Sequence, residues 1–487
     1  MASVRSLDAA FGYDTTSSGP GSAQIPVMGN TLRNLIEGAD LVMSHILHFY
    51  HLTALDYINT DTSILSQVAP WGNGKDNTSD MVTSGTADYL IGNYVKALDI
   101  RRKTHEMAAY IDGKHPCQPV LLPGGVTKVV DSALTGNLMT LLGADAAVLA
   151  GNTGINIRSF IKYCYIPDVI IVAKAFSGSL LVGSPGDGVG AGCKRYLAYG
   201  TFPTAAGVNF ISGGFLDTTA YVSGAMTTGW TPSALDVNQI TESVAYSRYD
   251  DACEGLQPAA GLTLPSPSKT NTFGAAYSWL KAPMYSGLAA EVGPLARVLV
   301  NYAAGVSPWV YTVDKFLTDI GLMSGTGATT NVPNLRSVLG RHAARALETN
   351  AVADQMVGWI NSLTTTSATG ETYRHKDIPR TGVGYGLTEA PRGALGHWVT
   401  INGKKIAGYQ CVVPTTWNAR PRDIHGNMGP IETALSGINI GSATTSAMSA
   451  RIKVGRIVRS FDPCIACAVH IVSPDKEEVL KFELPTQ

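Results

Sequence analysis

A pair of cysteines near the carboxyl end sets the strongest constraint on this chain. Cys464 and Cys467 are separated by two residues, His470 follows three positions after Cys467, and only 17 residues remain beyond it. The chain has seven cysteines, and apart from this pair no two lie closer than 29 residues. Two thiolates at this spacing can hold one metal ion from one side, so any remaining ligands must come from elsewhere. By itself the spacing fits zinc, iron–sulfur, redox or nickel chemistry.

Composition excludes several classes of function. The net charge is −1 and only 15% of residues are charged, whereas a nucleic-acid-binding protein needs a basic surface. No apolar run reaches the length of a membrane span, and the first residues lack a signal-peptide pattern. The scattered cysteines form no disulfide framework, so the thiols are expected to be reduced or bound to metal. A sparsely charged surface is typical of a chain that buries much of itself against a partner.

Hydrophobic periodicity predicts a mostly helical chain. The predicted helices span residues 30–60, 83–111, 131–150, 288–304, 333–362 and 432–437, and Pro333 is placed in a first helical turn. Residues 175–274 are rich in Gly, Ser, Thr and Pro, which predicts an irregular, strand-containing excursion with a short strand near 207–211. Alternation around the Asn402-Gly403 turn predicts a β-hairpin over residues 397–413. The expected fold class is α+β and predominantly helical: a large helical-bundle core with small peripheral β-sheets.

Several stretches of the sequence resemble one known family. Residues 459–470, which contain both clustered cysteines, closely resemble the carboxyl-terminal signature of the large (catalytic) subunit of nickel–iron hydrogenases. Further matching stretches follow in the expected order: residues 48–52, 97–103, 123–127, 340–349, 389–398 and 409–418. The chain is identified as a member of this family, similar to its uptake type. The resemblance implies the nickel–iron hydrogenase large-subunit fold over residues 1–470 and a carboxyl-terminal extension, 471–487, that is cleaved on maturation.

The resemblance also implies a set of metal ligands. It makes Cys464 a terminal nickel ligand and Cys467 a bridge between nickel and iron. It places a magnesium (or iron) ion at His470, with the backbone carbonyl of Cys411 as a second ligand. Without the resemblance, the two thiols would be half of a zinc site, and a histidine this close to the terminus would be a solvated side chain.

A canopy over the metals is implied in the same way. Arg392 would hang over the open nickel–iron face and help to polarise dihydrogen, with Asp462 as its anionic partner. Four residues would wall the iron: Leu395, Val413, Pro414 and Thr415. The apolar members of this set suit a carbon monoxide ligand, and the threonine hydroxyl suits a cyanide nitrogen. Without the resemblance, Arg392 would be interpreted as part of a surface ion pair and Asp462 as a turn residue before Pro463. The four wall residues would be ordinary core residues at the end of a strand.

Histidines elsewhere in the chain are not assigned to metal. His45, His48 and His51 share one predicted helix, but their spacing does not keep all three on one face. Packed, hydrogen-bonded histidines are expected instead. The same interpretation, a structural helix network, is given to a second group: Arg341, His342 and Arg345.

The chain departs from the family pattern at two places. The family holds nickel with two C-x-x-C pairs, and this chain lacks the first. Its opening resembles the stretch that normally follows that pair. We therefore expect Met1 to be an internal methionine and the chain alone to be inactive. Ser44 stands where many relatives carry an aspartate that pairs with the canopy arginine, so a hydrogen bond could remain there without the charge.

The resemblance implies reversible oxidation of dihydrogen at a nickel–iron centre whose iron carries carbon monoxide and cyanide. Electrons would pass to iron–sulfur clusters of a small subunit. The other implied partners are a maturation endopeptidase, nickel-insertion proteins and a membrane cytochrome b. Partner subunits would hold the chain at the membrane on its periplasmic face, with a cytoplasmic location as the alternative. The competing functions are a non-catalytic fragment and a relative of the quinone-binding subunit of respiratory complex I, against which the retained Cys464, Cys467 and His470 argue.

Overall fold

The structure is a computed structural model of the chain. It describes residues 1–13, 24–58, 84–143, 155–176, 188–204, 207–219, 230–271, 274–323, 328–365, 370–438, 447–464, 468–472 and 478–483.

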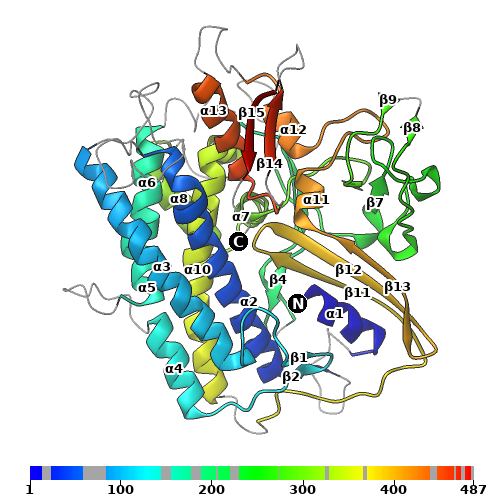
Figure 1. The fold of residues 1–487 in the computed structure, drawn as a ribbon. Helices are drawn as coiled ribbons and strands as arrows, with labels where there is room; N and C mark the ends of the chain where they lie inside the picture. The colour runs from blue at the N-terminus through cyan, green and yellow to red at the C-terminus, as the bar shows by residue number, and fades with distance from the viewer. Residues whose placement is uncertain are drawn as a thin grey trace.

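Long helices on one side of the molecule form the main hydrophobic core (Figure 1). Helices α2 (Val27–Leu47), α3 (Ser84–Asp112) and α10 (Val338–Thr365) run side by side, with α2 packed against both of the others. Helix α2 is buried on more than one face, because apolar residues occupy most of its circumference. Further helices pack against α10: α4 (Ser132–Leu142), α5 (Ile157–Phe160), α6 (Ile166–Ala175), α7 (Pro294–Ala303), α8 (Trp309–Asp319) and α9 (Ala328–Leu335).

Two helices of this core widen into π-helical turns. One turn, His48–Thr53, continues α2, and the other, Ile161–Tyr165, joins α5 to α6. A π turn holds an extra residue, which redirects the side chains around it. Aromatic rings from the two turns pack together, with ring centroids of Phe49 and Tyr165 5.3 Å apart. The helix distortions thus meet at one layer of the core.

A buried carboxylate lies beside these turns. Asp168 on α6 accepts a 2.5 Å hydrogen bond from the Tyr50 hydroxyl and bonds of 3.0 and 3.1 Å from the Asn93 amide. Burial raises the pKa of Asp168 to about 7, although both hydrogen bonds favour its ionised form. This group therefore titrates near neutral pH inside a helical core.

The end of α3 is tied to α2 through a histidine. His115 Nε2 lies 3.3 Å from Asp40 Oδ1, and His115 Nδ1 lies 3.6 Å from Asp112 Oδ2. Pairing with Asp112 and then with Asp40 raises the pKa of His115 to about 9, against the opposing effect of burial. The imidazolium therefore fastens α3 to α2 at neutral pH.

A three-stranded antiparallel sheet lies beside the helices (Figure 1). Its strands follow in chain order: β11 (Thr381–Ala390), β12 (Gly393–Asn402) and β13 (Lys405–Val412). Helix α1 (Ala2–Ala10) packs on β11 and β12. Alternate residues of β11 are glycines, and a Cβ at Gly384 would lie 2.3 Å from the Ser6 carbonyl oxygen. The missing side chains let the helix backbone rest directly on the strand.

Small two-stranded sheets and short helices fill the region between α6 and α7. Their strands are β3 (Arg195–Ala198), β4 (Thr201–Pro203), β5 (Asn209–Ile211), β6 (Gly214–Asp217), β7 (Ile240–Ser243), β8 (Thr270–Asn271), β9 (Gly274–Ala275) and β10 (Ala282–Tyr285). Their 3₁₀ turns are Val237–Gln239, Asp251–Cys253 and Pro258–Ala260. A separate hairpin, β1 (Leu121–Leu122) with β2 (Gly125–Val126), lies near the start of α2, and a 3₁₀ turn, Ala54–Asp56, follows the first π turn.

The carboxyl-terminal part returns to the junction between sheet and helices (Figure 1). Helices α11 (Pro414–Asn418), α12 (Pro430–Leu435) and α13 (Ala447–Ser460) come first. A final antiparallel pair follows, β14 (Ala468–Val472) with β15 (Glu478–Glu483). Because α13 packs on both α10 and the first π turn, the segment after Ser460 begins deep in the molecule.

The predicted fold class is confirmed: the chain is predominantly helical with small antiparallel sheets. Several predicted helix boundaries were wrong. The helix expected over 333–362 is two helices, because Pro333 lies inside α9 and the Ser337 hydroxyl accepts the Gly340 N–H at the start of α10. The helix expected from 288 begins only at Pro294, since residues before it pair with β3 as extended chain.

The remaining differences concern where helices end, one missed strand and the helices that were not predicted: α1, α5, α6, α8, α11 and α13. Helix α4 ends at Leu142, where Gly143 adopts a φ of 92°, and residues 144–150 lie outside the described part. The long helix expected over 30–60 is α-helical only to Leu47 and then becomes the π turn. The predicted hairpin is present as β12 and β13, but the preceding strand β11 was not predicted.

Candidate metal centre

Two segments far apart in the sequence meet where the metal site was predicted. The turn between β11 and β12 presents Arg392, and the chain after α13 presents Asp462 and Cys464. Arg392 Nη2 lies 3.2 Å from Asp462 Oδ1, and the Asp462 side chain is 3% exposed. The Cys464 N–H donates a 2.9 Å hydrogen bond to the Thr415 hydroxyl at the start of α11. The expected ion pair is therefore present, and it stands beside the first cysteine of the pair.

The turn that carries Arg392 is held from behind by α7. Arg297 donates to the Ala390 carbonyl at 3.0 Å and to the Pro391 carbonyl at 3.1 Å. Gly393 has a φ of 135°, and a Cβ there would lie 2.6 Å from the Gly293 nitrogen. Only glycine fits both this conformation and this close approach. The residue before Arg392 and the residue after it are thus both fixed.

Arg297 is itself part of a fully buried charge network. Its guanidinium pairs with Glu348 on α10 and with Glu389 on β11, and Glu348 also contacts His45 Nε2 at 2.7 Å. Burial raises carboxyl pKa values here, but for Glu348 the two Arg297 contacts and His45 outweigh it and hold the pKa at about 2. Glu389 has a single guanidinium contact, so burial prevails and raises its pKa to about 7. Burial also lowers the pKa of His45.

Two more histidines lie behind the ion pair. His48 Nε2 donates to the Arg459 carbonyl at 2.6 Å, and its ring stacks on His342 with centroids 5.5 Å apart. Burial lowers the pKa of both imidazoles well below the usual value, so both are neutral. The expectation of packed, hydrogen-bonded histidines is confirmed for His45 and His48, while the His51 ring packs on Tyr94 at 4.6 Å.

The backbone after α13 turns sharply to place the aspartate. Asp462 adopts a φ of 52°, which is uncommon for a residue with a side chain. Its N–H donates to the Arg459 carbonyl at 2.9 Å, closing the end of the helix. The left-handed residue redirects the chain, so that Cys464 reaches Thr415.

The described residues supply part of a metal site, although no three or more His, Cys, Asp or Glu side chains among them form a cluster that could hold an ion. Arg392 Nε and Asp462 Oδ2 are buried without a hydrogen-bond partner among the described residues, which is costly unless another group satisfies them. The Cys464 thiol beside them is exposed, and thiolate sulfur is a ligand that suits nickel. Two unsatisfied polar groups and one exposed thiol therefore lie together, a set that a further bound group could satisfy.

The residues predicted to wall the iron lie close together in the fold. Leu395 is half-buried on β12, and Val413 caps α11, at whose first position Pro414 is buried. Thr415 follows in α11 and contacts Cys464 as described. All four come from the strand ends and the short helix that face the segment after α13.

The other predicted ligands are placed only in part. Cys411 lies on β13 opposite His397, and its residue is exposed. Cys467 lies outside the described residues. His470 is in β14, where its backbone pairs with Lys481 of β15. The predicted extension 471–487 thus supplies the partner strand of β14.

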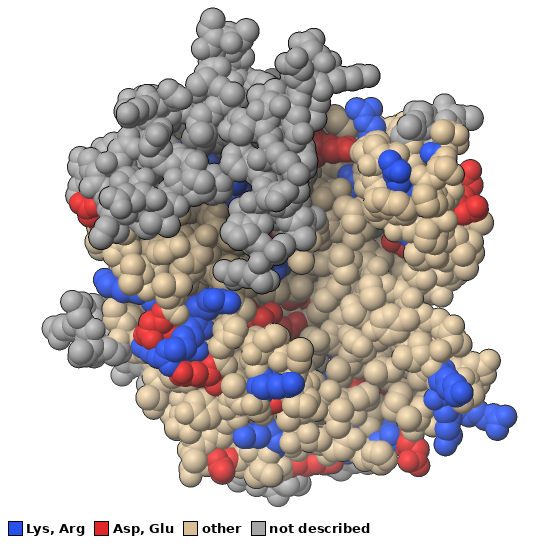
Figure 2. Space-filling model, viewed as in Figure 1, with Lys and Arg blue, Asp and Glu red and all other residues tan. Residues whose placement is uncertain are grey.

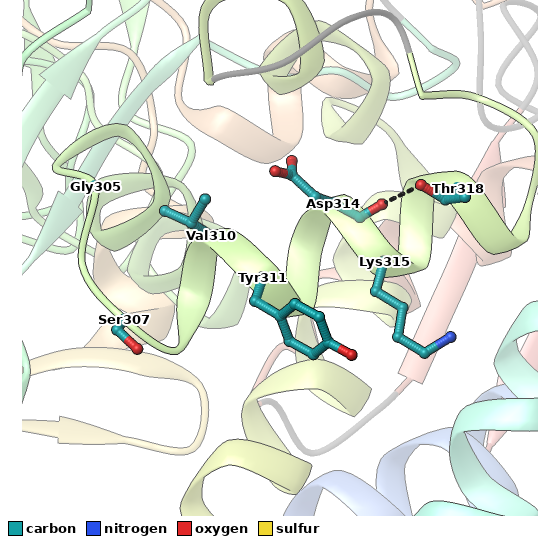
Figure 3. A pocket seen from close by; sticks show the side chains of 7 residues that line it. All are labelled: Gly305, Ser307, Val310, Tyr311, Asp314, Lys315 and Thr318. Atoms are coloured by element: carbon teal, nitrogen blue, oxygen red, sulfur yellow. Dashed lines mark hydrogen bonds between the residues drawn. The ribbon is translucent and has the colours of Figure 1, made fainter.

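Hollows elsewhere on the surface do not coincide with this site. An open groove of about 610 Å³ runs along α8 (Figure 3). The Thr318 hydroxyl donates to the Asp314 carbonyl there, and Lys315 pairs with Asp319, so these polar groups are already satisfied. A smaller hollow of about 140 Å³ lies between Trp398 on the sheet and the turn at Pro258. Neither hollow contains a residue of the candidate centre.

The charge distribution agrees with the composition. On the face shown in Figure 2, acidic and basic side chains occur in small mixed groups, and large areas carry neither. None of the helices that the structure describes is long and apolar enough to cross a bilayer.

A family comparison identifies the chain. A family model described as nickel-dependent hydrogenase matches residues 1–85 and 65–470. The chain belongs to the nickel-dependent hydrogenase family. It is 32% identical over 543 residues to the uptake hydrogenase large subunit of Rhizobium leguminosarum bv. viciae, covering 99% of this chain and 86% of that protein. It is also 32% identical to the periplasmic [NiFeSe] hydrogenase large subunit of Desulfomicrobium baculatum, covering 98% and 83%.

Solved structures of the family share the fold. The nickel–iron–selenium hydrogenase of Desulfovibrio vulgaris Hildenborough in the reduced state superposes with a TM-score of 0.77 at 32% identity. The match covers 95% of this chain and 84% of that one. The reduced, active form from Desulfomicrobium baculatum gives a TM-score of 0.76, also at 32% identity. The resemblance drawn from the sequence motifs, including its uptake type, is thus confirmed.

Sequence reasoning missed the residues that hold the arginine turn in place. Arg297 and Glu348 lie 51 positions apart and meet only through helix packing. A signal was nevertheless present, because an arginine in the apolar stretch 294–303 must find a carboxylate to be buried. Glu389, directly before the Ala390-Pro391-Arg392 turn, was the nearest candidate.

Proposed function

We propose that this chain oxidises dihydrogen reversibly at a nickel–iron centre held in part by Cys464 and Cys467. The observation that supports it most directly is the ion pair of half-buried Arg392 with buried Asp462, beside the exposed thiol of Cys464. Family membership supports the same chemistry. When bound, the centre would supply an electron-accepting site at which the hydrogen–hydrogen bond can be polarised and split.

The contribution of Arg392 is positional and electrostatic. Its guanidinium is a fixed, permanently charged donor, and Asp462 holds one of its edges at 3.2 Å. Nε remains without a described partner, so this N–H can be aimed at a group in the pocket. A preorganised cation stabilises developing negative charge without reorganisation.

Thr415 can serve two groups at once. Its oxygen accepts the Cys464 N–H, which fixes the backbone of the ligand cysteine. The hydroxyl proton remains available to donate, and we propose that it binds a cyanide nitrogen on iron. Leu395 and Pro414 would offer carbon monoxide an apolar wall.

A second metal and several partners belong to the same proposal. Magnesium (or iron) would be held by His470 and the Cys411 carbonyl. Electrons would pass to an iron–sulfur small subunit, since the relatives are named large subunits. A maturation endopeptidase, nickel-insertion proteins and a membrane cytochrome b complete the proposed partners. The location would be the membrane, through those subunits, on its periplasmic face.

We propose that residues 471–487 are a maturation extension removed after His470. The backbone pairing of β15 with β14, the strand that contains His470, supports a coupling between these residues and the position of the histidine. Removing β15 would release β14 and let His470 take a new position. Intact-mass analysis of active enzyme tests the proposal: a terminus at His470 supports it, and active enzyme ending at Gln487 contradicts it.

The thiol ligands can be tested directly. Cys464→Ala and Cys467→Ala should each abolish bound nickel and hydrogen-dependent dye reduction in the assembled enzyme. Cys117→Ala is the matched control, because Cys117 is also an exposed thiol but belongs to the loop after α3. Full nickel content in either ligand variant would refute the assignment.

The canopy role predicts a different outcome. Arg392→Lys keeps the charge but loses the planar fork, so turnover should fall by about two orders of magnitude. Nickel content should stay near that of the unmodified enzyme. Unchanged turnover would show that Arg392 does not act on the reaction.

A further inference from the structure

Arg345 on α10 is a buried cation to which the proposed function assigns no role. The residue is 1% exposed. Its Nη1 donates to the Ser460 carbonyl at 2.6 Å and, at 3.4 Å, to the Arg341 carbonyl of its own helix. Nε has no hydrogen-bond partner among the described residues, and no described carboxylate lies within 4.0 Å of the guanidinium. A buried guanidinium without a carboxylate in contact carries a large desolvation cost, so its presence needs a physical explanation.

Four other buried arginines of this chain have a carboxylate in direct contact. The pairs are Arg33 with Asp8, Arg297 with Glu348, Arg341 with Glu291, and Arg420 with Asp423. Each pairs two charges that could not be buried singly without a large desolvation cost. Arg345 differs because its strongest contact is a neutral carbonyl at the end of α13.

That carbonyl lies two residues before the aspartate of the candidate centre. Cations stabilise the carboxyl end of a helix, where the last carbonyls are unpaired. Arg341, one turn earlier on α10, assists: its guanidinium carbon lies 3.6 Å from the centre of the Phe461 ring, and Nη1 lies 3.4 Å from the Ser460 hydroxyl. Two arginines from one helix therefore clamp the turn that runs into Asp462.

The charge of Arg345 also acts on Asp462. Burial lowers the pKa of Arg345 to about 10, and Asp462 is the anion that opposes this effect most strongly. One oxygen of Asp462 contacts Arg392, while the other is buried without a described partner. The aspartate thus contacts one guanidinium, that of Arg392, and interacts with the charge of Arg345 beyond contact distance.

We infer that Arg345 is a positioning residue: by binding the Ser460 carbonyl it clamps the end of α13 and so fixes the turn that presents the carboxylate of Asp462 to Arg392. Through Asp462 it sets the orientation of Arg392 over the pocket. This inference rests on the proposed function for its effect on turnover. Its effect on the geometry of the segment from Ser460 to Cys464 does not depend on that function.

A double-mutant cycle tests the coupling. Arg345→Met in the assembled, nickel-loaded enzyme should lower turnover by about 10²-fold, the cost of a small misplacement of a reacting group. If Arg345 acts through Asp462, Arg345→Met combined with Asp462→Asn should be within about twofold of Asp462→Asn alone. If the losses of turnover caused by the two single substitutions multiplied in the double variant, the inference would be overturned. Arg33→Met is the control, because Arg33 is equally buried but pairs with Asp8, and its effect should multiply.

A conservative variant separates charge from general stability. Arg345→Lys keeps the cation, so its turnover should be at least about tenfold higher than that of Arg345→Met. Because the Lys variant is expected to fold even if the Met variant does not, it can be compared with the unmodified enzyme directly. If the turnover of Arg345→Lys were as low as that of Asp462→Asn while its unfolding midpoint stayed unchanged, the inference would be overturned.

A readout without hydrogen distinguishes this inference from the proposed function. In the full chain prepared without nickel, the alkylation rate of Cys464 by iodoacetamide is followed by peptide mass analysis. Arg345→Met should change that rate several-fold and leave the rate at Cys117 unaltered. An unchanged rate at Cys464 would refute the clamp. Enzyme that fails to oxidise hydrogen at all would instead refute the proposed function, and the alkylation result would still decide the role of Arg345.

Discussion

Asp168 offers the sharpest quantitative test of the fold, because its carboxyl group is buried in the layer that supports the candidate centre. Its pKa rises from 3.8 to about 7 in the folded chain, chiefly through burial. A raised pKa means that folding favours the protonated form. The stability that this group contributes is therefore complete below pH 3.8 and is lost as pH rises through 7.

The size of the effect follows from the shift. About three pKa units, at about 1.4 kcal/mol each, amount to about 4 kcal/mol once the pH exceeds 7. Most of that change, about 2–3 kcal/mol, falls between about pH 5 and pH 8 by the same linkage. An asparagine side chain cannot ionise, so the free energy of unfolding of Asp168→Asn should rise by this amount relative to the unmodified chain across that interval. A constant offset is expected from altered hydrogen bonds to Tyr50 and Asn93.

The measurement is urea-induced unfolding at several pH values, followed by tryptophan fluorescence and far-ultraviolet circular dichroism. Coincident transitions from the two probes would justify a two-state free energy. Asp354→Asn is the control, because its carboxylate lies on the surface of the same helical layer, paired with Arg158. Parallel pH profiles for Asp168→Asn and the unmodified chain would refute the reasoning.

Three further predictions concern packing and charge. Gly384→Ala should destabilise the chain by about 1–3 kcal/mol, since its Cβ would enter the backbone of α1, whereas Gly408→Ala on β13, with no atom nearer than 3.8 Å, should cost less in the same unfolding assay. His115 contributes stability that is present below pH 6.5 and lost as pH rises through about 9; the protection factors of amides at the end of α3, which correct for the base-catalysed rise of intrinsic exchange, should therefore fall over that interval, and His115→Gln should abolish this fall. Arg297→Met leaves two buried carboxylates without their cation and should cost about 3–5 kcal/mol; an unfolding midpoint equal to that of the unmodified chain would contradict the network.

Local patterns in the sequence were sufficient for some parts of the fold and not for others. Periodicity located α2 and α3, because a helix that buries one face repeats its apolar residues at helical spacing. It failed at Pro333, where proline is compatible with a helix start but the hydroxyl of Ser337 caps a new helix further on. It also failed at β11, whose alternating glycines remove the apolar signal that marks a strand.

The candidate centre shows the same division. The residue types of Cys464, Asp462 and Arg392 could be read from the motifs that contain them. The supports could not, because Arg297 and Arg345 reach the centre only through tertiary packing of α7 and α10. Long-range ion pairs have no characteristic spacing in the sequence by which they could be recognised, since the fold determines which residues become partners.

Helix α10 imposes a limit on how this chain can change in length. Within eight positions it carries Arg341, Arg345 and Glu348, which reach Glu291, the Ser460 carbonyl and Arg297 respectively. An inserted residue among them would rotate everything beyond it by about 100° around the helix axis. All three contacts belong to one rotational register, so insertions and deletions in this stretch should be absent from functional variants. The exposed turn at Gly403, by contrast, can accept extra residues, because the strands on either side keep their pairing whatever the length of the loop.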